Sequence, residues 1–363
     1  MEGIPTTAGC RAVADEAEPA AKDATCLAGA RAAGARIVGR TNLHELAFGV
    51  SGVNPWFGTP VNPLDRTRVP GGSSSGAAVA VATGEADVSY GTDTGGSIRI
   101  PSACCGTAGL KTTWGRIPLE GVWPLAPSLD TVGPMARDVR GLVTGMRLLE
   151  PRFELAPAVP ARVGRLRLRC DPRIGSALDR ALEATGWEVV DIELPEWDEA
   201  NSACGLVLVA EAWRTNHLLV GRNPDGIGRD VLARLRSGRE VDEAALSSAR
   251  ATGRRWRVRL EALFEDVGLL ATPTLAVFPP PIAHAEALLS ARARCTLPAN
   301  LAGVPALALP VPSSGPLPAS LQLIGPAGSE EQLLSAGLMV EASLRSDLPR
   351  DDHEAERPCE KEP

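Results

Sequence analysis

The chain has 363 residues, of which 44% are hydrophobic, and a net charge of −7. This length suits one large domain or two smaller ones, with enough apolar residues for a buried core. The acidic balance, the lack of a basic stripe and the 4% aromatic content argue against nucleic-acid binding. The longest uncharged stretch, residues 295–329, is broken by seven prolines, so we expect no membrane span. The N-terminus has no basic or strongly apolar region typical of a signal peptide, and we expect a cytoplasmic protein.

The cysteines, histidines and lysines limit the kinds of metal, cofactor or catalytic site that this sequence can form. The eight cysteines include no CxxC pair, and the four histidines are isolated. This pattern indicates reduced thiols and predicts neither a metal site nor a cofactor. Only three of the 37 basic residues are lysine, at Lys22, Lys111 and Lys361. Any catalytic lysine of this sequence must be one of these three.

The first hundred residues predict an alternation of helices and strands. The Ala-rich stretch at 19–33 predicts a helix, and a short strand is expected at 37–39. A polar loop with several prolines follows from about residue 49 to 72. The small apolar residues at 76–84 predict a tightly packed helix, and residues 86–90 alternate like a short strand that leads into a loop at 91–97.

The remainder of the chain is richer in helix. We expect helices at 176–185, 203–217, 228–237, 242–264 and 330–345, and a buried strand at 267–273. The tail at 347–363 is charged and contains prolines, which predicts disorder. The elements together indicate an α/β fold, a mixed and twisted β-sheet with α-helices on both faces.

Two Gly/Ser loops are the strongest chemical signal. The first is Val-Pro-Gly-Gly-Ser-Ser-Ser-Gly at 69–76, and the second is Gly-Thr-Asp-Thr-Gly-Gly-Ser-Ile-Arg at 91–99. A single loop of this kind is most often a turn or a linker. Both loops, however, adjoin apolar elements. Glycines next to a serine also let successive N–H groups converge on an anion, which an acyl-transfer enzyme needs beside its nucleophile.

Other serine-hydrolase patterns fit less well. Residues 72–76 formally match the Gly-x-Ser-x-Gly elbow of α/β-hydrolases, but that elbow follows a strand directly. Here the polar, proline-containing segment 62–70 precedes it, and such a segment cannot be a central strand. A Ser-x-x-Lys motif is absent, because no serine lies three residues before any lysine.

From residue 71 to residue 135 the sequence resembles the amidase signature family. The likeness rests on the two serine loops, on Gly-Leu-Lys-Thr-Thr-Trp-Gly-Arg at 109–116 and on Ser-Leu-Asp-Thr-Val-Gly-Pro-Met at 128–135. Further landmarks at 38–42, 54–58, 272–274 and 300–305 extend it over most of residues 3–345. The resemblance implies that residues 1–346 form one amidase domain with the α/β fold described above.

The resemblance also implies roles for residues of both loops. Ser97 would be the nucleophile, and Ser73, joined to Gly72 by a cis peptide bond, would relay its proton to a neutral buried lysine. The N–H groups of Thr94, Gly95, Gly96 and Ser97 would form the oxyanion hole. Residues expected to support these groups are Asp93, Arg99, Gly72 and Ser74. The acyl pocket would lie between Ala47-Phe48-Gly49 and the variable region at about 140–290.

The catalytic lysine is where the sequence departs from the family pattern. In the family this lysine precedes a turn that matches residues 5–10 here, so its counterpart would lie before Met1. Lys22 comes after that turn and is expected to be an exposed residue at the start of a helix. Lys111 matches a position that we take as structural, and Lys361 lies in the tail. We therefore expect a chain that lacks its N-terminal strand and lysine segment, through a misassigned start or a real truncation.

The expected activity is hydrolysis of a linear carboxylic amide to an acid plus ammonia or an amine, through a serine acyl-enzyme. The expected partners are a small-molecule amide and, as an open option, a second copy of the chain in a homodimer. Two alternatives remain. One is a catalytically inactive homologue that only binds, and the other is the amidase subunit of a tRNA-dependent amidotransferase.

Overall fold

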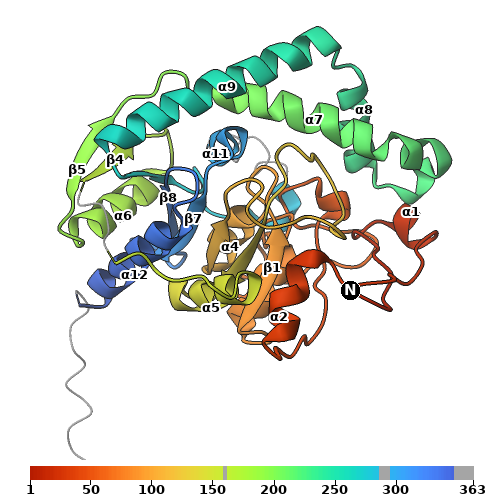
Figure 1. Cartoon of the computed structure of the whole chain (residues 1–363), viewed down its shortest axis with the longest axis horizontal. Coiled ribbons are helices and arrows are strands. Elements are labelled where there is room, and N and C mark those ends of the chain that lie inside the picture. Colours follow the sequence, from red (N-terminus) through yellow and green to blue (C-terminus); the bar gives the residue numbers. More distant parts are fainter. Residues whose placement is uncertain (158–161, 286–294, 347–363) are drawn as a thin grey trace, which may run out of the picture.

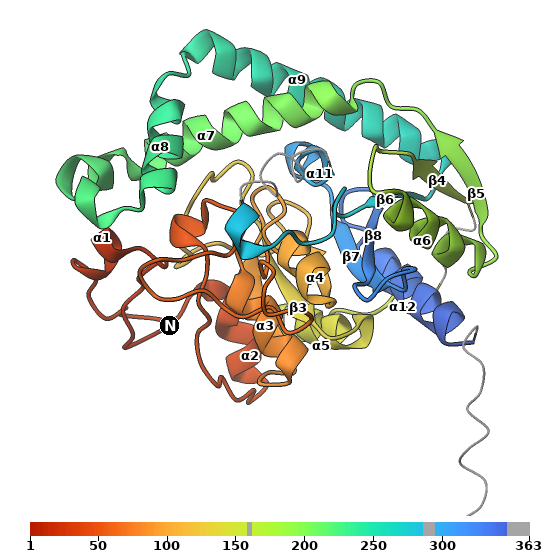
Figure 2. The same ribbon diagram turned by 180° about the vertical axis from the view of Figure 1, so that it is seen from behind.

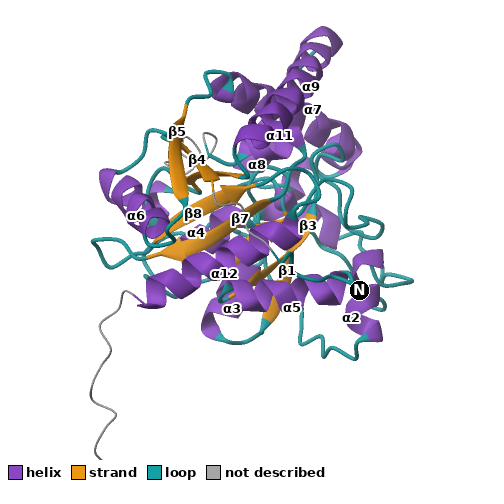
Figure 3. Cartoon of the chain, turned by 60° about the vertical axis from the view of Figure 1, so that its left-hand side comes forward, coloured by secondary structure: helices purple, strands orange, loops and turns teal. Residues whose placement is uncertain are grey.

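The computed structural model describes residues 1–157, 162–285 and 295–346. Its centre is an eight-stranded sheet in the order β1-β3-β2-β7-β8-β6-β4-β5 (Figure 3). The strands are β1 (Val88–Thr92), β2 (Ala108–Lys111), β3 (Val132–Ala136), β4 (Arg162–Leu166), β5 (Glu188–Ile192), β6 (Leu269–Pro273), β7 (Ala306–Val311) and β8 (Ala319–Ile324).

The sheet is mixed in direction. Every pair from β1 across to β6 is antiparallel, whereas β4 pairs in parallel with both β6 and β5. The parallel part needs crossover connections, and the helical segments between β4, β5 and β6 provide them. The order also brings β2 beside β7, so that residues near 110 and near 306 become neighbours.

Helices cover both faces of this sheet (Figures 1 and 2). The α-helices are α1 (Arg11–Ala14), α2 (Ala28–Ala32), α3 (Ser75–Thr83), α4 (Arg99–Cys105), α5 (Val139–Leu149), α6 (Pro172–Glu183), α7 (Trp197–Arg222), α8 (Arg229–Arg239), α9 (Glu243–Asp266), α11 (Leu297–Ala302) and α12 (Glu330–Ser346). Short 3-10 turns occur at η1 (Thr25–Leu27), η2 (Glu45–Ala47), η3 (Pro224–Gly226) and η4 (Ile282–His284).

Alternating side chains of β7 show how the two faces are divided. Leu307 and Leu309 belong to a core built with α5, α6 and α12. Ala306 points the opposite way, into a second core built with α7, α9 and α11. Successive residues of a strand face opposite sides of the sheet, so both faces are buried. The expectation of a mixed sheet with helices on both faces is thus confirmed.

The sequence predicts the long helices better than the short elements. The helices expected at 176–185, 203–217, 228–237, 242–264 and 330–345 correspond to α6, α7, α8, α9 and α12, and the strands at 86–90 and 267–273 correspond to β1 and β6. The expected helix at 19–33 contains only η1 and α2. The strand expected at 37–39 does not form, because no described strand pairs with this segment and Val38 is 59% exposed. The predicted tail at 347–363 lies outside the described residues.

Candidate active site

The second serine loop is built around the carboxylate of Asp93. This residue follows β1 directly, and its oxygens accept hydrogen bonds from the N–H groups of Gly96 at 2.8 Å and Ile98 at 3.2 Å. The chain therefore curls around one buried anion before α4 begins at Arg99. Gly96 has φ of 123°, and a Cβ there would lie 2.6 Å from Thr296 Oγ1, so the turn requires glycine.

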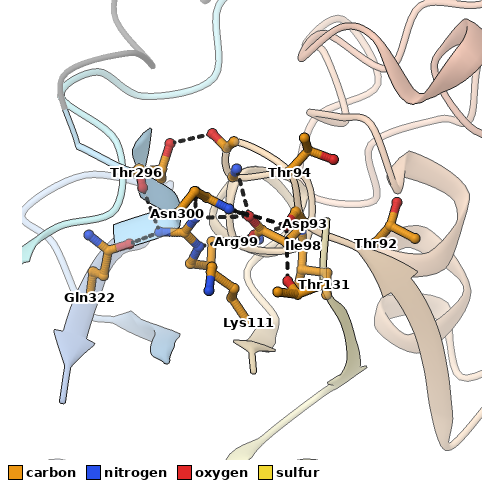
Figure 4. Close-up of polar contacts among 12 residues, drawn as sticks. Thr92, Asp93, Thr94, Ile98, Arg99, Lys111, Thr131, Thr296, Asn300 and Gln322 are labelled. Atoms are coloured by element: carbon orange, nitrogen blue, oxygen red, sulfur yellow. Dashed lines mark hydrogen bonds and ion pairs between the residues drawn. The ribbon is translucent and has the colours of Figure 1, made fainter. Parts of the chain in front are cut away.

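Arg99 neutralises this carboxylate in the interior (Figure 4). Its Nη2 lies 2.9 Å from Asp93 Oδ1, and both side chains are fully buried. Nε donates to Asp93 Oδ2 at 3.0 Å. The Nη1 and Nη2 groups also donate to Gln322 Oε1 at 2.7 Å, Asn300 Oδ1 at 2.6 Å and the Thr296 carbonyl at 3.1 Å. Burial opposes the charge on Asp93, but the nearby guanidinium holds the pKa of its carboxyl far below the usual range. The predicted supporting residues Asp93 and Arg99 thus form one ion pair beneath the loop.

Residues distant in the sequence also form hydrogen bonds with the second serine loop. Thr94 Oγ1 donates to Asp130 Oδ1 at 2.6 Å, and Thr296 Oγ1 donates to the Gly95 carbonyl at 2.7 Å. Asn300 Nδ2 adds a hydrogen bond of 2.8 Å to Asp93. The family-like stretches near residues 130 and 300 therefore help to hold this loop in place.

The first serine loop lies directly against the second. The peptide bond between Gly72 and Ser73 is cis. The N–H of Ser74 donates to the Ser97 carbonyl at 3.1 Å, and Ser74 Oγ lies 3.4 Å from the Thr92 carbonyl. The structure thus brings together the two loops that the sequence singled out, with Ser73 fully buried and Ser97 6% exposed.

Ser73 Oγ is buried and has no hydrogen-bond partner among the described residues. Neither described lysine supplies one. Lys22 is exposed and pairs with Glu120 at 2.5 Å, whereas Lys111 is buried and donates to the carbonyls of Thr112 and Val304, each at 2.9 Å. Lys361 lies outside the described residues. A hydroxyl without a partner in the interior is costly, so this atom marks the place where a proton acceptor would fit.

A small cavity opens beside Ser97. It has a volume of ≈ 80 Å³. Its lining residues are Ala47, Phe48, Gly49, Val50, Thr94, Gly95, Ser97, Leu125, Gly205, Leu208, Val209, Arg234 and Leu297. The lining therefore joins Ala47-Phe48-Gly49 to the region between 140 and 290, where the acyl pocket was expected.

The four predicted oxyanion donors divide into two groups. Thr94, Gly95 and Ser97 line the cavity, and their N–H groups donate to no acceptor within the described residues. Gly96 departs from the prediction, because its N–H donates to Asp93 and the residue does not line the cavity. Three of the four predicted donors thus line the cavity with N–H groups that have no acceptor among the described residues.

Arg234 is the one cavity-lining residue with a charge, and sequence reasoning missed it. Its Nη2 donates to Asp230 Oδ2 at 2.9 Å, and its guanidinium lies over the Phe48 ring. Its Nε is buried without a partner in the described part of the chain. Burial lowers the pKa of this arginine, although Asp230 and Glu45 counteract that effect. Arg234 therefore brings a guanidinium, a group that can only donate hydrogen bonds, to the cavity wall.

No cluster of metal-ligating side chains occurs within the described ranges, and none of the helices described is long and apolar enough to cross a bilayer. The groups that this cavity offers to a ligand are the Ser97 hydroxyl, the N–H groups of its loop and the Arg234 guanidinium.

The fold and the paired Gly/Ser loops are those expected of an α/β protein of the amidase class. The family model described as Amidase matches residues 1–159 and 169–334. The chain is therefore a member of the amidase family.

Proteins with different named activities are similar to this chain. The chain is 36% identical to a glutamyl-tRNA(Gln) amidotransferase subunit of Thermus thermophilus, over 95% of this chain and 83% of that protein. It is also 36% identical to 2-amino-5-chloromuconic acid deaminase of Comamonas testosteroni, over 85% of this chain and 72% of that protein. A crystal structure of an amidase matches with a TM-score of 0.87 and 33% identity, over 95% of this chain and 82% of that chain.

Proposed function

We propose that this protein hydrolyses a short linear amide whose acyl part carries an anionic group, with residues 1–346 as the amidase domain. The observation that carries the proposal is a single cavity lined by Ser97, by unengaged N–H groups and by Arg234. The anion would contact Arg234 while the amide carbonyl lies at Ser97. The small volume of ≈ 80 Å³ favours a short acyl chain.

In the proposed reaction, Ser97 Oγ attacks the amide carbonyl carbon and forms a C–O bond. Its proton passes to Ser73 Oγ, and the proton of Ser73 passes to a base. The N–H groups of Thr94, Gly95 and Ser97 stabilise the tetrahedral oxyanion. The C–N bond then breaks, the amine leaves with the returned proton, and water hydrolyses the acyl-enzyme to release the acid.

We propose a lysine as the base, supplied by an N-terminal segment as the family resemblance implies. The support is the buried hydroxyl of Ser73, which lacks an acceptor among the described residues. A gene extended upstream to include an in-frame lysine segment should hydrolyse amides much faster than the present chain. Added methylamine should partly rescue the present chain but not its Ser73→Ala variant. Equal rates for the extended and the present chain, with no rescue, would reject this assignment.

The nucleophile is tested with a fluorophosphonate probe, which reports a reactive serine without a known substrate. The chain should be labelled, and Ser97→Ala should abolish labelling while Ser247→Ala, at an exposed serine of α9, keeps it. If the folded chain is not labelled, with or without methylamine, it is an inactive binding homologue instead.

The anionic specificity is tested with succinamate and its uncharged analogue butyramide. Arg234→Met should raise KM for succinamate by about tenfold to a hundredfold, the usual effect of losing a charged hydrogen bond, and leave butyramide unchanged. Arg236→Met is the matched control, because Arg236 is exposed on the same helix. Equal effects on both amides would show that Arg234 contributes only to packing.

A second candidate is the amidase component of an amidotransferase, favoured by the 36% identity to the Thermus thermophilus protein. That function predicts a chain that copurifies with partner proteins and releases ammonia from glutamine only in the complex. Hydrolysis of free amides by the isolated chain supports the first proposal over this one.

A further inference from the structure

His44 packs against Gly49, one of the residues that line the cavity beside Ser97. Its ring lies so close to Gly49 that a Cβ there would be 1.9 Å from His44 Nε2. Its backbone N–H donates to the Ser73 carbonyl at 3.0 Å. The residue is only 4% exposed, so it is part of the framework that joins the first serine loop to the cavity wall.

The ring of His44 also contacts the cavity arginine. Arg234 Nη2 lies 3.3 Å from His44 Nε2 and 2.9 Å from Asp230 Oδ2. Because a guanidinium can only donate, Nε2 acts as the acceptor and the ring proton lies on Nδ1. Nδ1 in turn lies 3.4 Å from Ser51 Oγ. A hydrogen bond from Arg234 Nη2 to Nε2 requires the neutral form of His44.

Protonation of His44 would change these contacts. The ring would then carry a hydrogen on Nε2, facing a guanidinium 3.3 Å away, and it would compete for Asp230 Oδ2, which lies 3.7 Å from Nε2. Asp230 stays ionised at neutral and mildly acidic pH, since hydrogen bonding to His44 and the charge of Arg234 lower its pKa to about 2 despite partial burial. A charged His44 removes Nε2 as an acceptor for Arg234 Nη2 and shares the other acceptor, Asp230 Oδ2, with it.

Near His44, the structure describes two further ionisable side chains, Glu45 and Cys10. Glu45 adjoins His44 and accepts from the Gly228 N–H at 2.9 Å, and burial raises the pKa of its carboxyl. Cys10, beside Glu45, stays a thiol because burial raises its pKa to about 12. Among the described residues, His44 and Glu45 are therefore the two ionisable side chains near Arg234 that the experiment must separate.

We propose that His44 is a positioning residue whose neutral form orients Arg234 for the anionic group of the substrate, and whose protonation weakens the binding of anionic amides alone. The inference rests on the proposed function. Because His44 does not contact the reacting atoms, it is expected to act on affinity and not on the chemical step.

The test is calorimetric binding of malonamate, succinamate and glutaramate to the Ser97→Ala variant, which cannot turn them over, between about pH 5.5 and 8.5. Butyramide is the uncharged probe. The dissociation constant of the best anionic amide should rise roughly tenfold from the alkaline to the acidic end, while that of butyramide stays constant. Constant affinity for the anionic amides, or tighter binding in acid, would overturn the proposal.

His44→Gln separates His44 from Glu45, because the Gln Oε1 can accept from Arg234 but does not titrate. It should keep the alkaline affinity and lose the pH dependence. The control variant His217→Gln, at an exposed histidine of α7, should keep the pH dependence. A pH dependence that persists in His44→Gln assigns the titration to Glu45 and rejects the role of His44.

A second measurement does not depend on a folded His44 variant. By linkage, if the neutral form binds tenfold more tightly, succinamate must lower the His44 pKa by about one unit, as measured by NMR of labelled histidine. An unchanged His44 pKa on saturation would reject the proposal. If no anionic amide binds more tightly than butyramide at any pH, the anionic specificity itself is wrong, although labelling of Ser97 would still support amidase chemistry.

Discussion

At the scale of single residues, the candidate site depends on buried charges that neutralise one another. Asp93 and Arg99 are fully buried and paired, and Lys111 lies close enough to influence the pKa of Asp93. Such charges stabilise the fold only while every partner is present. The ion pair beneath Ser97 therefore acts as a rigid base for the loop that carries the proposed nucleophile and the proposed oxyanion donors.

Lys111 makes a testable contribution to the pH dependence of stability. Burial, with Arg99 nearby, lowers the pKa of its amine from 10.5 to about 7. Between these values the unfolded chain binds a proton that the folded chain does not, so the free energy of unfolding should rise with pH from about 7 towards about 10. Lys111→Met should remove this rise, as measured by urea unfolding at several pH values. Lys22→Met, at an exposed lysine, should leave it unchanged.

At the scale of elements, α7 and α8 together form one side of the candidate cavity. Gly205, Leu208 and Val209 come from α7, and Arg234 comes from α8. The N-terminus of α8 is held by the bond from the Gly228 N–H to Glu45, next to the cavity wall. The position of Arg234 therefore depends on how closely α8 packs against α7.

Gly238 permits this close packing. A Cβ at Gly238 would lie 2.0 Å from the Val209 carbonyl oxygen, so the two helices would have to separate. Gly238→Ala should destabilise the protein by about 1–3 kcal/mol in urea unfolding, despite the better helix propensity of alanine. Gly175→Ala in α6, whose Cβ would meet only Cys170 Sγ at 3.8 Å, should instead be neutral or slightly stabilising. Equal effects at both positions would contradict the steric argument.

At the scale of the whole molecule, Arg116 joins three segments that are far apart in the sequence. Its guanidinium lies 2.7 Å from Glu150 at the end of α5 and 2.6 and 2.5 Å from Glu330 and Glu331 at the start of α12. Glu330 is fully buried and also accepts from the Thr113 N–H at 2.6 Å. One cation thus compensates a group of carboxylates at the junction of the central sheet with α5 and α12.

Arg116→Lys should therefore be costly, although it keeps the charge. A single ammonium group cannot replace the planar fork that reaches three carboxylates, which leaves buried Glu330 poorly compensated. We expect a loss of about 2–4 kcal/mol in the free energy of unfolding. Arg167→Lys is the comparison, because Arg167 is 57% exposed and pairs with Asp179 and Asp191 at the surface. A loss at Arg167 as large as that at Arg116 would show that burial is not the cause.

The sequence by itself determined the elements and motifs that depend on local order. The helices α6 to α9 and α12 were predicted, and each is at least 11 residues long. The two serine loops were recognised because their glycines and serines are contiguous. Their close approach was implied by family resemblance, and the structure shows it directly in the bond from Ser74 to Ser97.

Only the tertiary structure decided which distant residues complete the site. Asn300 and Gln322 reach Arg99 because β7 and β8 lie inside the sheet, an order that no local pattern contains. His44 and Arg234 meet across 190 positions of the chain. The segment at 37–39 resembles a strand in composition but forms none, because a strand requires a partner with which to share hydrogen bonds. Side-chain chemistry is local, whereas burial, pairing and the neighbours of a charge arise only when the chain has folded.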